Sequence, residues 1–300
     1  MIGVSGASGF IGGRLVRALT SDGLQPTALA RGVLPESSDD IDTVFHCAGY
    51  AHAFSSLSAE DAAMHWQGNF EGTRNLVEAA GKAGVQRFVF LSSVKAMAEP
   101  GDALIDEGFP GEPETAYGQS KLAAELAVIE AGKHYGMHVV NLRLAMVYGA
   151  GGRGNLERMG RLVERGLFPP LPETGNHRSL VHVDDVVSAM RLVAYDVRAA
   201  GGTYIVASQH APSGRELFDA LRTAQGLSSC TWSVPESVLQ AVALMGDVIE
   251  KMLKRRLPLN SEVLERLLGS AWYSPSRIER ELGWGARISL MDGLSEMQRR

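Results

Sequence analysis

Three glycines near the N-terminus limit the folds open to this chain more than any other feature. Gly6, Gly9 and Gly12 follow the apolar run Ile2 to Ser5 and precede a helical pattern. A buried strand that turns on glycine directly into a helix is typical of the first unit of a doubly wound α/β sheet. There the first glycine allows the tight turn, the second lets the backbone approach a pyrophosphate, and the third lets the helix pack closely on the strand. The spacing therefore predicts a dinucleotide-binding loop at a helix N-terminus.

A tyrosine and a lysine four residues apart form the second feature. Tyr117 and Lys121 share one face of a predicted helix over Ala116 to Tyr135. A phenol titrates near ~10 and is a poor base at neutral pH unless a neighbouring cation favours its phenolate. Lys121 can be that cation, so the pair can transfer a proton.

Two serines end an apolar run before this helix. Phe88 to Leu91 reads as a buried parallel strand, and Ser92 and Ser93 follow it. Ligands of open α/β sheets bind beyond the carboxyl ends of the strands. At least one of the two hydroxyls is therefore expected to hydrogen-bond a substrate oxygen, and capping of the following turn is the alternative role for only one of them.

Together these stretches resemble the extended short-chain dehydrogenase/reductases, the NAD-dependent epimerase/dehydratase family. The resemblance covers nearly the whole chain and points to the nucleotide-sugar 4-epimerase and 4-keto-sugar reductase branch. Further family landmarks follow in order along the chain: His46 to Gly49, Asn69 to Leu76, Arg143 with Tyr148 and Gly149, Arg178 to Asp185, and Leu282 to Trp284.

The resemblance implies a role for each matching residue. Ser93 would be the hydroxyl of a catalytic triad, with Ser92 as the alternative if the strand end is shifted by one residue. Tyr117 would be the general acid and base, and Lys121 would bind the nicotinamide ribose and lower the tyrosine pKa. The positions implied to bind an NAD(P) cofactor are Gly6, Ser8, Gly9, Phe10, Ile11, Gly12, Arg31, Cys47, Ala48, Tyr117 and Lys121.

Arg31 bears on the choice between the two nicotinamide cofactors. An acidic residue about 20 residues after the glycines selects NAD, whereas an arginine accommodates the 2′-phosphate of NADP. Arg31 ends the second predicted strand and favours NADP, with Arg14 as a second phosphate contact. In the alternative, Arg31 stacks on the adenine ring, and its presence does not distinguish NADP from NAD.

Three departures from the family pattern narrow the expectation. Val94 and Lys95 stand where the 4,6-dehydratases carry an acidic pair, so elimination of water is not expected and hydride transfer at a single carbon remains. Lys95 is either an exposed loop residue or a contact to substrate phosphate. Only the twelve residues Arg31 to Asp42 precede the next strand, so a helix and a strand of the family are missing and the sheet edge should be truncated. The sugar loop is altered as well, at Met146 and Ala150.

Two residues remain as candidate contacts to a nucleotide sugar. These are Asn155 and Arg178, for which capping and packing are the alternative roles. No metal site is expected, because Gly136 breaks the helix between His134 and His138 and no carboxylate or thiol cluster accompanies them.

Composition and charge exclude other classes of protein. The net charge is −5, and the one basic cluster, Lys254 to Arg256, reads as a solvated helix face, so a nucleic-acid partner is not expected. Cys47 and Cys230 indicate no disulfide framework. The chain shows no signal peptide, and its longest apolar helical segment, Val234 to Leu253, is too polar to span a bilayer. We expect a cytoplasmic protein without a membrane partner.

Strand and helix patterns alternate and predict an α/β fold: a Rossmann-type doubly wound parallel sheet with a smaller, mainly helical C-terminal substrate lobe. Residues 1–150 and 178–208 are expected to form the dinucleotide-binding domain, and residues 151–177 and 209–300 the lobe. The resemblance further implies a homodimer, in which helices over Ala59 to Ala83 and Ala116 to Tyr135 pair with their copies.

The expected activity is hydride transfer at C4 of a nucleotide-activated sugar, with a UDP-linked hexose as the leading substrate. The sequence leaves open whether the enzyme is a 4-epimerase or a 4-keto-sugar reductase. Two alternatives are a reductase of a hydroxysteroid or dihydroflavonol-like ketone, and a dinucleotide-binding protein without turnover. The presence of both Tyr117 and Lys121 argues against the last.

Overall fold

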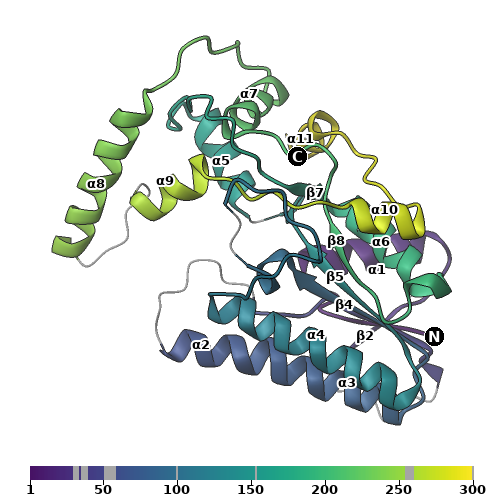
Figure 1. Ribbon diagram of the computed structural model, residues 1–300. Helices are drawn as coiled ribbons and strands as arrows, with labels where there is room; N and C mark the ends of the chain where they lie inside the picture. Colours follow the sequence, from purple (N-terminus) through teal and green to yellow (C-terminus); the bar gives the residue numbers. More distant parts are fainter. Residues whose placement is uncertain are drawn as a thin grey trace.

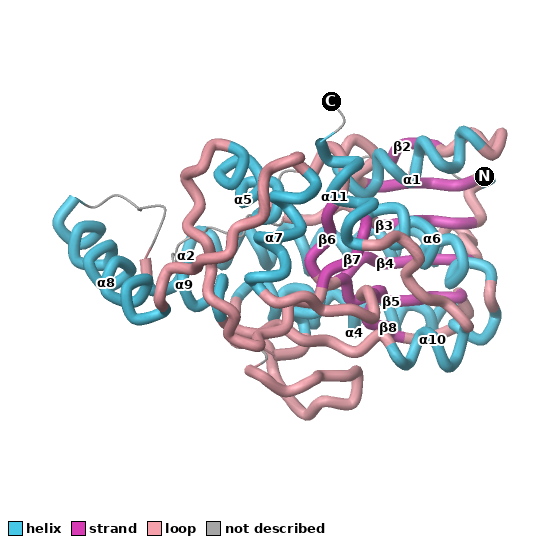
Figure 2. Tube along the Cα trace, turned by 90° about the horizontal axis from the view of Figure 1, so that it is seen from above, coloured by secondary structure: helices cyan, strands magenta, loops and turns pink. Residues whose placement is uncertain are grey.

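A parallel sheet forms the centre of the molecule. The computed structural model describes residues 1–29, 34, 40–50, 59–98, 101–152, 154–253 and 260–298. Six strands pair in parallel in the order β2-β1-β3-β4-β5-β8, and β6 pairs with β7 in a separate small sheet (Figure 2). The strands are β1 (Ile2–Ser5), β2 (Thr27–Leu29), β3 (Thr43–His46), β4 (Arg87–Ser93), β5 (His138–Leu144), β6 (Met146–Tyr148), β7 (Leu180–His182) and β8 (Thr203–Val206).

Helices cover both faces of the sheet, which confirms the predicted doubly wound α/β fold (Figure 1). The α-helices are α1 (Phe10–Ser21), α2 (Ala59–His65), α3 (Gly72–Lys82), α4 (Ala116–Tyr135), α5 (Asn155–Glu164), α6 (Val183–Tyr195), α7 (Gly214–Ala224), α8 (Glu236–Leu253), α9 (Ser261–Leu268), α10 (Ser276–Leu282) and α11 (Leu290–Gln298). A π-helical segment, Trp66–Glu71, joins α2 to α3, and short 3₁₀ turns follow β4 (Val94–Ala96) and α6 (Val197–Ala199).

Strand β4 shows how the two faces are filled. Its successive side chains point to opposite faces, as they must in a strand. Phe88 and Phe90 pack with residues of α3 and α4, whereas Val89 and Leu91 belong to the core that α1 and α6 share. Because both faces of β4 are buried, Phe88 to Leu91 are all apolar. Their packing holds the carboxyl end of β4 beside α4.

The sheet ends at β2 within the part of the chain that the structure describes. This agrees with the short segment that follows β2 in the sequence, which predicts a truncated edge. Residues 30–33 and 35–39 lie outside the described residues, and Arg31 is among them. The predicted contact of Arg31 to a cofactor therefore stays a prediction.

A separate core holds the lobe together. It combines side chains of α5, α7, α8, α9 and α11 with Tyr148 of β6 and Leu180 of β7. Helix α10 packs elsewhere, because Ile278 and Leu282, with Trp284 after them, belong to the core above the sheet. The sequence placed the segment around α10 in the lobe. We propose instead that this segment belongs to the dinucleotide-binding domain. Among the described residues, no helix has both the length and the apolar character that crossing a bilayer requires.

Candidate active site

The glycine loop between β1 and α1 is packed too tightly for side chains. Gly6 has φ +68°, and a Cβ there would lie 2.7 Å from the backbone nitrogen of Ala48. A Cβ on Gly12 would lie 2.2 Å from the Gly6 carbonyl oxygen. Gly12 therefore lets α1 approach the turn itself, rather than the strand as the sequence predicted.

The start of α1 is open to a ligand. Gly9 caps the helix without a side-chain hydrogen bond, and Ser8 and Gly9 are both exposed. Phe10 and Ile11 begin the first turn, which carries no acidic residue. Uncapped N–H groups at a helix N-terminus attract anions, so this cradle fits the pyrophosphate of a dinucleotide. Cys47 and Ala48, just after β3, border the same turn across Gly6, and they would lie beside such a ligand.

Ser93 and Tyr117 meet beyond the carboxyl end of β4. Ser93 lies beside Tyr117, and both side chains are partly exposed. Burial raises the pKa of Tyr117, and the neighbouring Ser93 hydroxyl lowers that pKa in part. Ser92 is buried, with only 4% of its surface exposed. Ser93 is therefore the hydroxyl that reaches the phenol, and Ser92 faces the interior.

Lys121 lies one turn further along α4. Its Nζ donates a hydrogen bond to the carbonyl oxygen of Leu91 at 2.8 Å and lies 4.7 Å from the centre of the Phe90 ring. Burial lowers the pKa of Lys121 to about 8, although the nearby Glu125 carboxylate acts against that shift. The sequence predicted that Lys121 sets the tyrosine pKa. Burial raises that pKa and Ser93 lowers it, and the effect of Lys121 on it stays a prediction.

Lys121 also lies beside the loop after β3. A Cβ on Gly49 would lie 3.3 Å from the Lys121 Nζ and 3.2 Å from the Asn69 side-chain oxygen. The ammonium group thus lies between the catalytic helix and the loop expected to border the cofactor. This position fits the predicted contact to a nicotinamide ribose.

Asn69 fixes the start of α4 relative to that loop. Its amide oxygen accepts from Tyr50 N at 2.7 Å, and its amide nitrogen donates to the Ser120 hydroxyl at 3.1 Å. Ser120 in turn donates to the carbonyl oxygen of Tyr117 at 2.8 Å. Asn69 lies in the π-helical segment, a form often found at functional sites. The sequence marked Asn69 only as a family landmark, and no pattern in it predicted a π-helix.

Two further side chains lie near the site, and the sequence did not predict a role for either of them. The ring of His65 meets the ring of Tyr117 edge-on, with centroids 5.5 Å apart. Glu125, one turn beyond Lys121, is buried and receives a two-pronged hydrogen bond from Arg143, with distances from 2.7 to 3.2 Å. The spacing of four between Tyr117, Lys121 and Glu125 was visible in the sequence and could have identified Glu125.

The predicted substrate contacts are dispersed. The Lys95 carbonyl oxygen packs against Gly118 of α4, and its side chain is partly exposed. Asn155 is exposed at the first residue of α5. Arg178 donates to the carbonyl oxygen of Gly269 at 3.2 Å, and burial lowers its pKa. The Lys95 N–H donates to the Ser93 hydroxyl at 3.3 Å, so Ser93 also caps the 3₁₀ turn. The substrate roles of the Lys95 side chain, Asn155 and Arg178 stay predictions.

The sequence suggested that Arg14 contacts a cofactor phosphate, but in the structure Arg14 binds two carboxylates. Its guanidinium donates to both carboxylate oxygens of Asp184 and to Glu296 at 2.6 Å. His182, Asp184 and Glu296 could form a set of metal ligands by distance alone. Arg14 pairs with both acids, so the cluster is better explained as an ion-pair network than as a metal centre.

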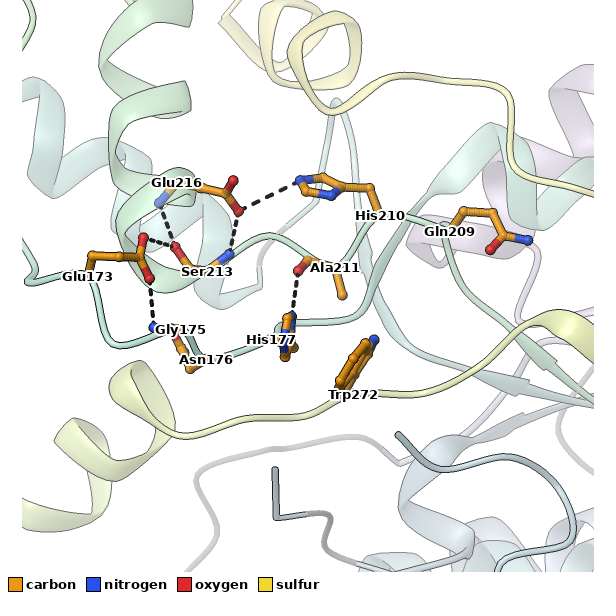
Figure 3. A pocket seen from close by; sticks show the side chains of 10 residues that line it. All are labelled: Glu173, Gly175, Asn176, His177, Gln209, His210, Ala211, Ser213, Glu216 and Trp272. Atoms are coloured by element: carbon orange, nitrogen blue, oxygen red, sulfur yellow. Dashed lines mark hydrogen bonds and ion pairs between the residues drawn. The ribbon is translucent and has the colours of Figure 1, made fainter. Parts of the chain in front are cut away.

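A hollow of about 350 Å³ in the lobe contains none of the predicted site residues (Figure 3). On one side His177 stacks on Trp272 with ring centres 3.8 Å apart. On the other, Ser213 donates to Glu173 at 2.7 Å and accepts from the backbone of Glu216. These polar groups serve the capping box of α7, so the hollow has a structural explanation.

Comparison with known proteins adds independent information. The model of the "NAD dependent epimerase/dehydratase family" matches residues 2–207. A UDP-glucose 4-epimerase of Vibrio cholerae is 31% identical over 320 aligned residues, which cover 98% of this chain and 93% of that protein. A 4-hydroxy-2-methyl-3-oxo-4-farnesyl-3,4-dihydroquinoline-1-oxide ketoreductase of Stigmatella aurantiaca is 26% identical over 98% of this chain and 95% of its own.

Solved structures agree on the fold. The structure of MoeE5 in complex with UDP-glucose and NAD superposes with a TM-score of 0.76 at 24% identity, covering 99% of this chain and 96% of that one.

Proposed function

Since the chain belongs to the NAD-dependent epimerase/dehydratase family, we propose that it is an NAD(P)-dependent enzyme that transfers a hydride at C4 of a nucleotide-activated hexose. The proposed reaction is 4-epimerisation of a UDP-hexose. Reduction of a 4-keto sugar is the second form of the same chemistry. The similarity to the V. cholerae UDP-glucose 4-epimerase over nearly the full length of both chains supports the first form.

One observation carries the proposal. A serine hydroxyl and a tyrosine phenol lie side by side at the carboxyl end of β4, one helical turn from a buried lysine. The glycine loop and the loop after β3 lie at the same edge of the sheet, where ligands of such sheets bind. A proton-transfer pair beside a dinucleotide cradle is what hydride transfer to or from a secondary alcohol requires.

The residues divide the reaction between them. Tyr117, as phenolate, takes the proton from O4 while the C4–H bond breaks and the C4=O bond forms. Ser93 donates a hydrogen bond to that oxygen and holds it beside the phenol. Lys121 binds the ribose and supplies positive charge near the phenolate. A nicotinamide cofactor held by the glycine loop and Lys121 would supply hydride acceptance and hydride donation at C4. In an epimerisation, Tyr117 would give its proton back to O4 when hydride is donated to the opposite face of C4.

Elimination of water is not part of the proposal. Val94 and Lys95 follow Ser93, and neither side chain can protonate a leaving hydroxyl as a carboxylic acid does. Both begin the 3₁₀ turn after β4, next to the proposed site. Lys95, Asn155 and Arg178 remain the proposed contacts to the nucleotide sugar.

For the cofactor we propose NADP over NAD, on the arginine at position 31. Arg14 is no longer part of this proposal, because Asp184 and Glu296 hold its guanidinium. Binding of NADPH and NADH, compared by fluorescence titration for the parent and for Arg31→Ala, tests the preference. Tighter binding of NADH by the parent protein would contradict it.

A reductase of a non-sugar ketone is the second candidate function. It is favoured by the 26% identity to the S. aurantiaca ketoreductase over nearly the whole chain. In this reading Ser93, Tyr117 and Lys121 keep their roles and only the carbonyl substrate changes. Consumption of NADPH with ketones but with no 4-keto sugar would select it.

Replacement of Tyr117 by phenylalanine tests the shared chemistry. Tyr117→Phe should lower turnover by about 10²- to 10⁴-fold, because the general acid and base is lost while the ring stays. Tyr135→Phe is a matched control on the same helix, since that phenol bonds Glu78 and lies far from the site in the sequence of α4. Turnover is measured with UDP-glucose, its N-acetyl analogue and a 4-keto sugar with NADPH.

The pattern of results separates the forms of the proposal. Conversion of a UDP-hexose without net change of cofactor indicates an epimerase, and stoichiometric loss of NADPH absorbance indicates a reductase. Full turnover by Tyr117→Phe on every accepted substrate would show that the acid is assigned wrongly.

A further inference from the structure

His65 contacts two tyrosines beside the proposed catalytic site. Its ring meets the Tyr117 ring edge-on with centroids 5.5 Å apart, and the Tyr50 ring edge-on with centroids 5.0 Å apart. Aromatic rings attract each other in tilted arrangements at such distances. His65 is buried, with only 4% of its surface exposed. The surrounding side chains therefore hold its ring in one place against Tyr117.

The π-helical segment fixes Tyr50 next to His65. His65 is the last residue of α2 and directly precedes that segment. From within the segment, Asn69 exchanges two hydrogen bonds with the backbone of Tyr50, at 2.7 and 3.1 Å. Gly68 lies against the same residue, since a Cβ there would be 3.2 Å from the Tyr50 Cβ. Tyr50 and His65 are thus attached to one continuous helical stretch.

That stretch also holds the backbone of the catalytic helix. It runs beside α4 (Figure 1). The Asn69 amide donates to the Ser120 hydroxyl, and Ser120 donates to the carbonyl oxygen of Tyr117. The backbone of Tyr117 is therefore positioned through Ser120, while its ring is contacted by His65.

Proton transfer needs the ring as well as the backbone to be in place. A general base must lie within about 2.6–3.2 Å of the atom whose proton it takes. Rotation about its side-chain bonds can carry the phenol oxygen of Tyr117 away although α4 stays where it is. A misplacement of about 1 Å can lower a rate by about 10²-fold. Ser93 lies beside the phenol, and His65 is the aromatic neighbour that restricts the ring.

We propose that His65 is a positioning residue for the catalytic phenol: its ring packs against Tyr117 and fixes where the phenol oxygen lies relative to Ser93 and the substrate. The proposal rests on the proposed function, because it gives a supporting partner to the general acid and base of that function. No proton passes through His65, which acts by contact alone.

Replacement of His65 by alanine and by phenylalanine tests the proposal. His65→Ala should lower kcat about tenfold and leave KM for substrate and cofactor within about twofold of the parent, because the ring positions the phenol and binds neither ligand. His65→Phe retains a ring and should recover kcat to within about threefold of the parent. His134→Ala is the matched control on α4, since it removes a ring that meets Tyr135 edge-on at 4.5 Å and should leave turnover unchanged.

A double-mutant cycle separates positioning from general damage to the fold. In Tyr117→Phe the phenol oxygen is absent, so addition of His65→Ala should cause no further loss of turnover. The same fractional loss in both backgrounds would overturn the proposal, as would parent-like kcat in His65→Ala or no recovery in His65→Phe. Full turnover by Tyr117→Phe would instead refute the general acid of the proposed function, so the two failures are distinguishable.

Crystal structures of the variants test the same point without turnover. The phenol oxygen of Tyr117 should leave its place beside Ser93 in His65→Ala and keep that place in His65→Phe. His65→Leu fills most of the buried space without a planar ring, so it should behave like His65→Ala and serves in its place if thermal unfolding shows that the alanine variant is not folded. An unmoved phenol oxygen in the variant without a ring would overturn the proposal.

Discussion

Burial of the Lys121 ammonium group lowers the stability of the fold. Its ammonium is buried among Phe90, Leu91 and the loop after β3, where burial lowers its pKa to about 8. The buried Glu125 carboxylate, held by Arg143, lies one turn away and favours the charged form. A charge in such a place is retained at the expense of stability, which is typical of catalytic positions.

Replacement of Lys121 by methionine should therefore stabilise the protein while it removes activity. The folded pKa of about 8 lies below the unfolded value of 10.5, so between these values the unfolded chain binds the proton more tightly. The free energy of unfolding should rise as the pH increases through this window. Lys121→Met should remove that rise and increase the free energy of unfolding near neutral pH by about 1–3 kcal/mol. Urea unfolding on both sides of the window measures it, and equal pH dependence in parent and variant would contradict it.

Helix α4 is the element on which the site depends. Thr115 caps its start by accepting from Gly118 N at 3.1 Å, and Gly136 ends it in the left-handed region. Within it, Gly118 has no room for a side chain, since a Cβ would lie 2.2 Å from the Lys95 carbonyl oxygen. The first turn of α4 is thus pressed onto the 3₁₀ turn that follows Ser93, and this contact brings Tyr117 to the serine.

Gly118→Ala should damage both stability and catalysis. Because the clash is with backbone, α4 must shift away from β4, at a cost of about 2 kcal/mol or more, and Tyr117 moves with it. Gly285→Ala is the control, since a Cβ there meets no atom within 4 Å. Thermal unfolding and turnover are measured for both variants. Parent-like turnover in Gly118→Ala would show that the close contact does not position the phenol.

Elements with strong local signals were predictable, and elements set by distant packing were not. The range Ala116–Tyr135 agrees with the sequence prediction because a capping threonine and a glycine mark its ends, and α1 begins directly after the glycines as expected. The helix expected over Ala59 to Ala83 contains the π-helical segment, which side-chain spacing does not reveal. Likewise, only the tertiary fold shows that Arg14 is held by Asp184, because 170 residues separate them.

At the scale of the whole molecule, α4 has an exposed apolar side chain that the monomer does not use. Leu126 is 63% exposed, and Met64 and Trp66 are also exposed on the neighbouring helical stretch. We propose that these surfaces meet their copies in a homodimer of four helices, as the family resemblance implies.

Leu126→Arg should convert that dimer to monomer, because two buried arginines would face each other across the interface. Val197→Arg, at a side chain that is 82% exposed in the other part of the molecule, should leave the dimer intact. Sedimentation velocity at micromolar concentration measures both. A parent protein that sediments only as a monomer would remove the proposal.

The ion pairs of Arg14 join helix α1 to residues that are translated much later. Arg14 and Glu296 are 282 positions apart, yet their side chains are in direct contact beside the glycine loop. The contact to Asp184 can form once residue 184 has been translated, whereas the contact to Glu296 must wait for the last helix of the described chain. A polypeptide released between these two points would have α1 held by one carboxylate in place of two.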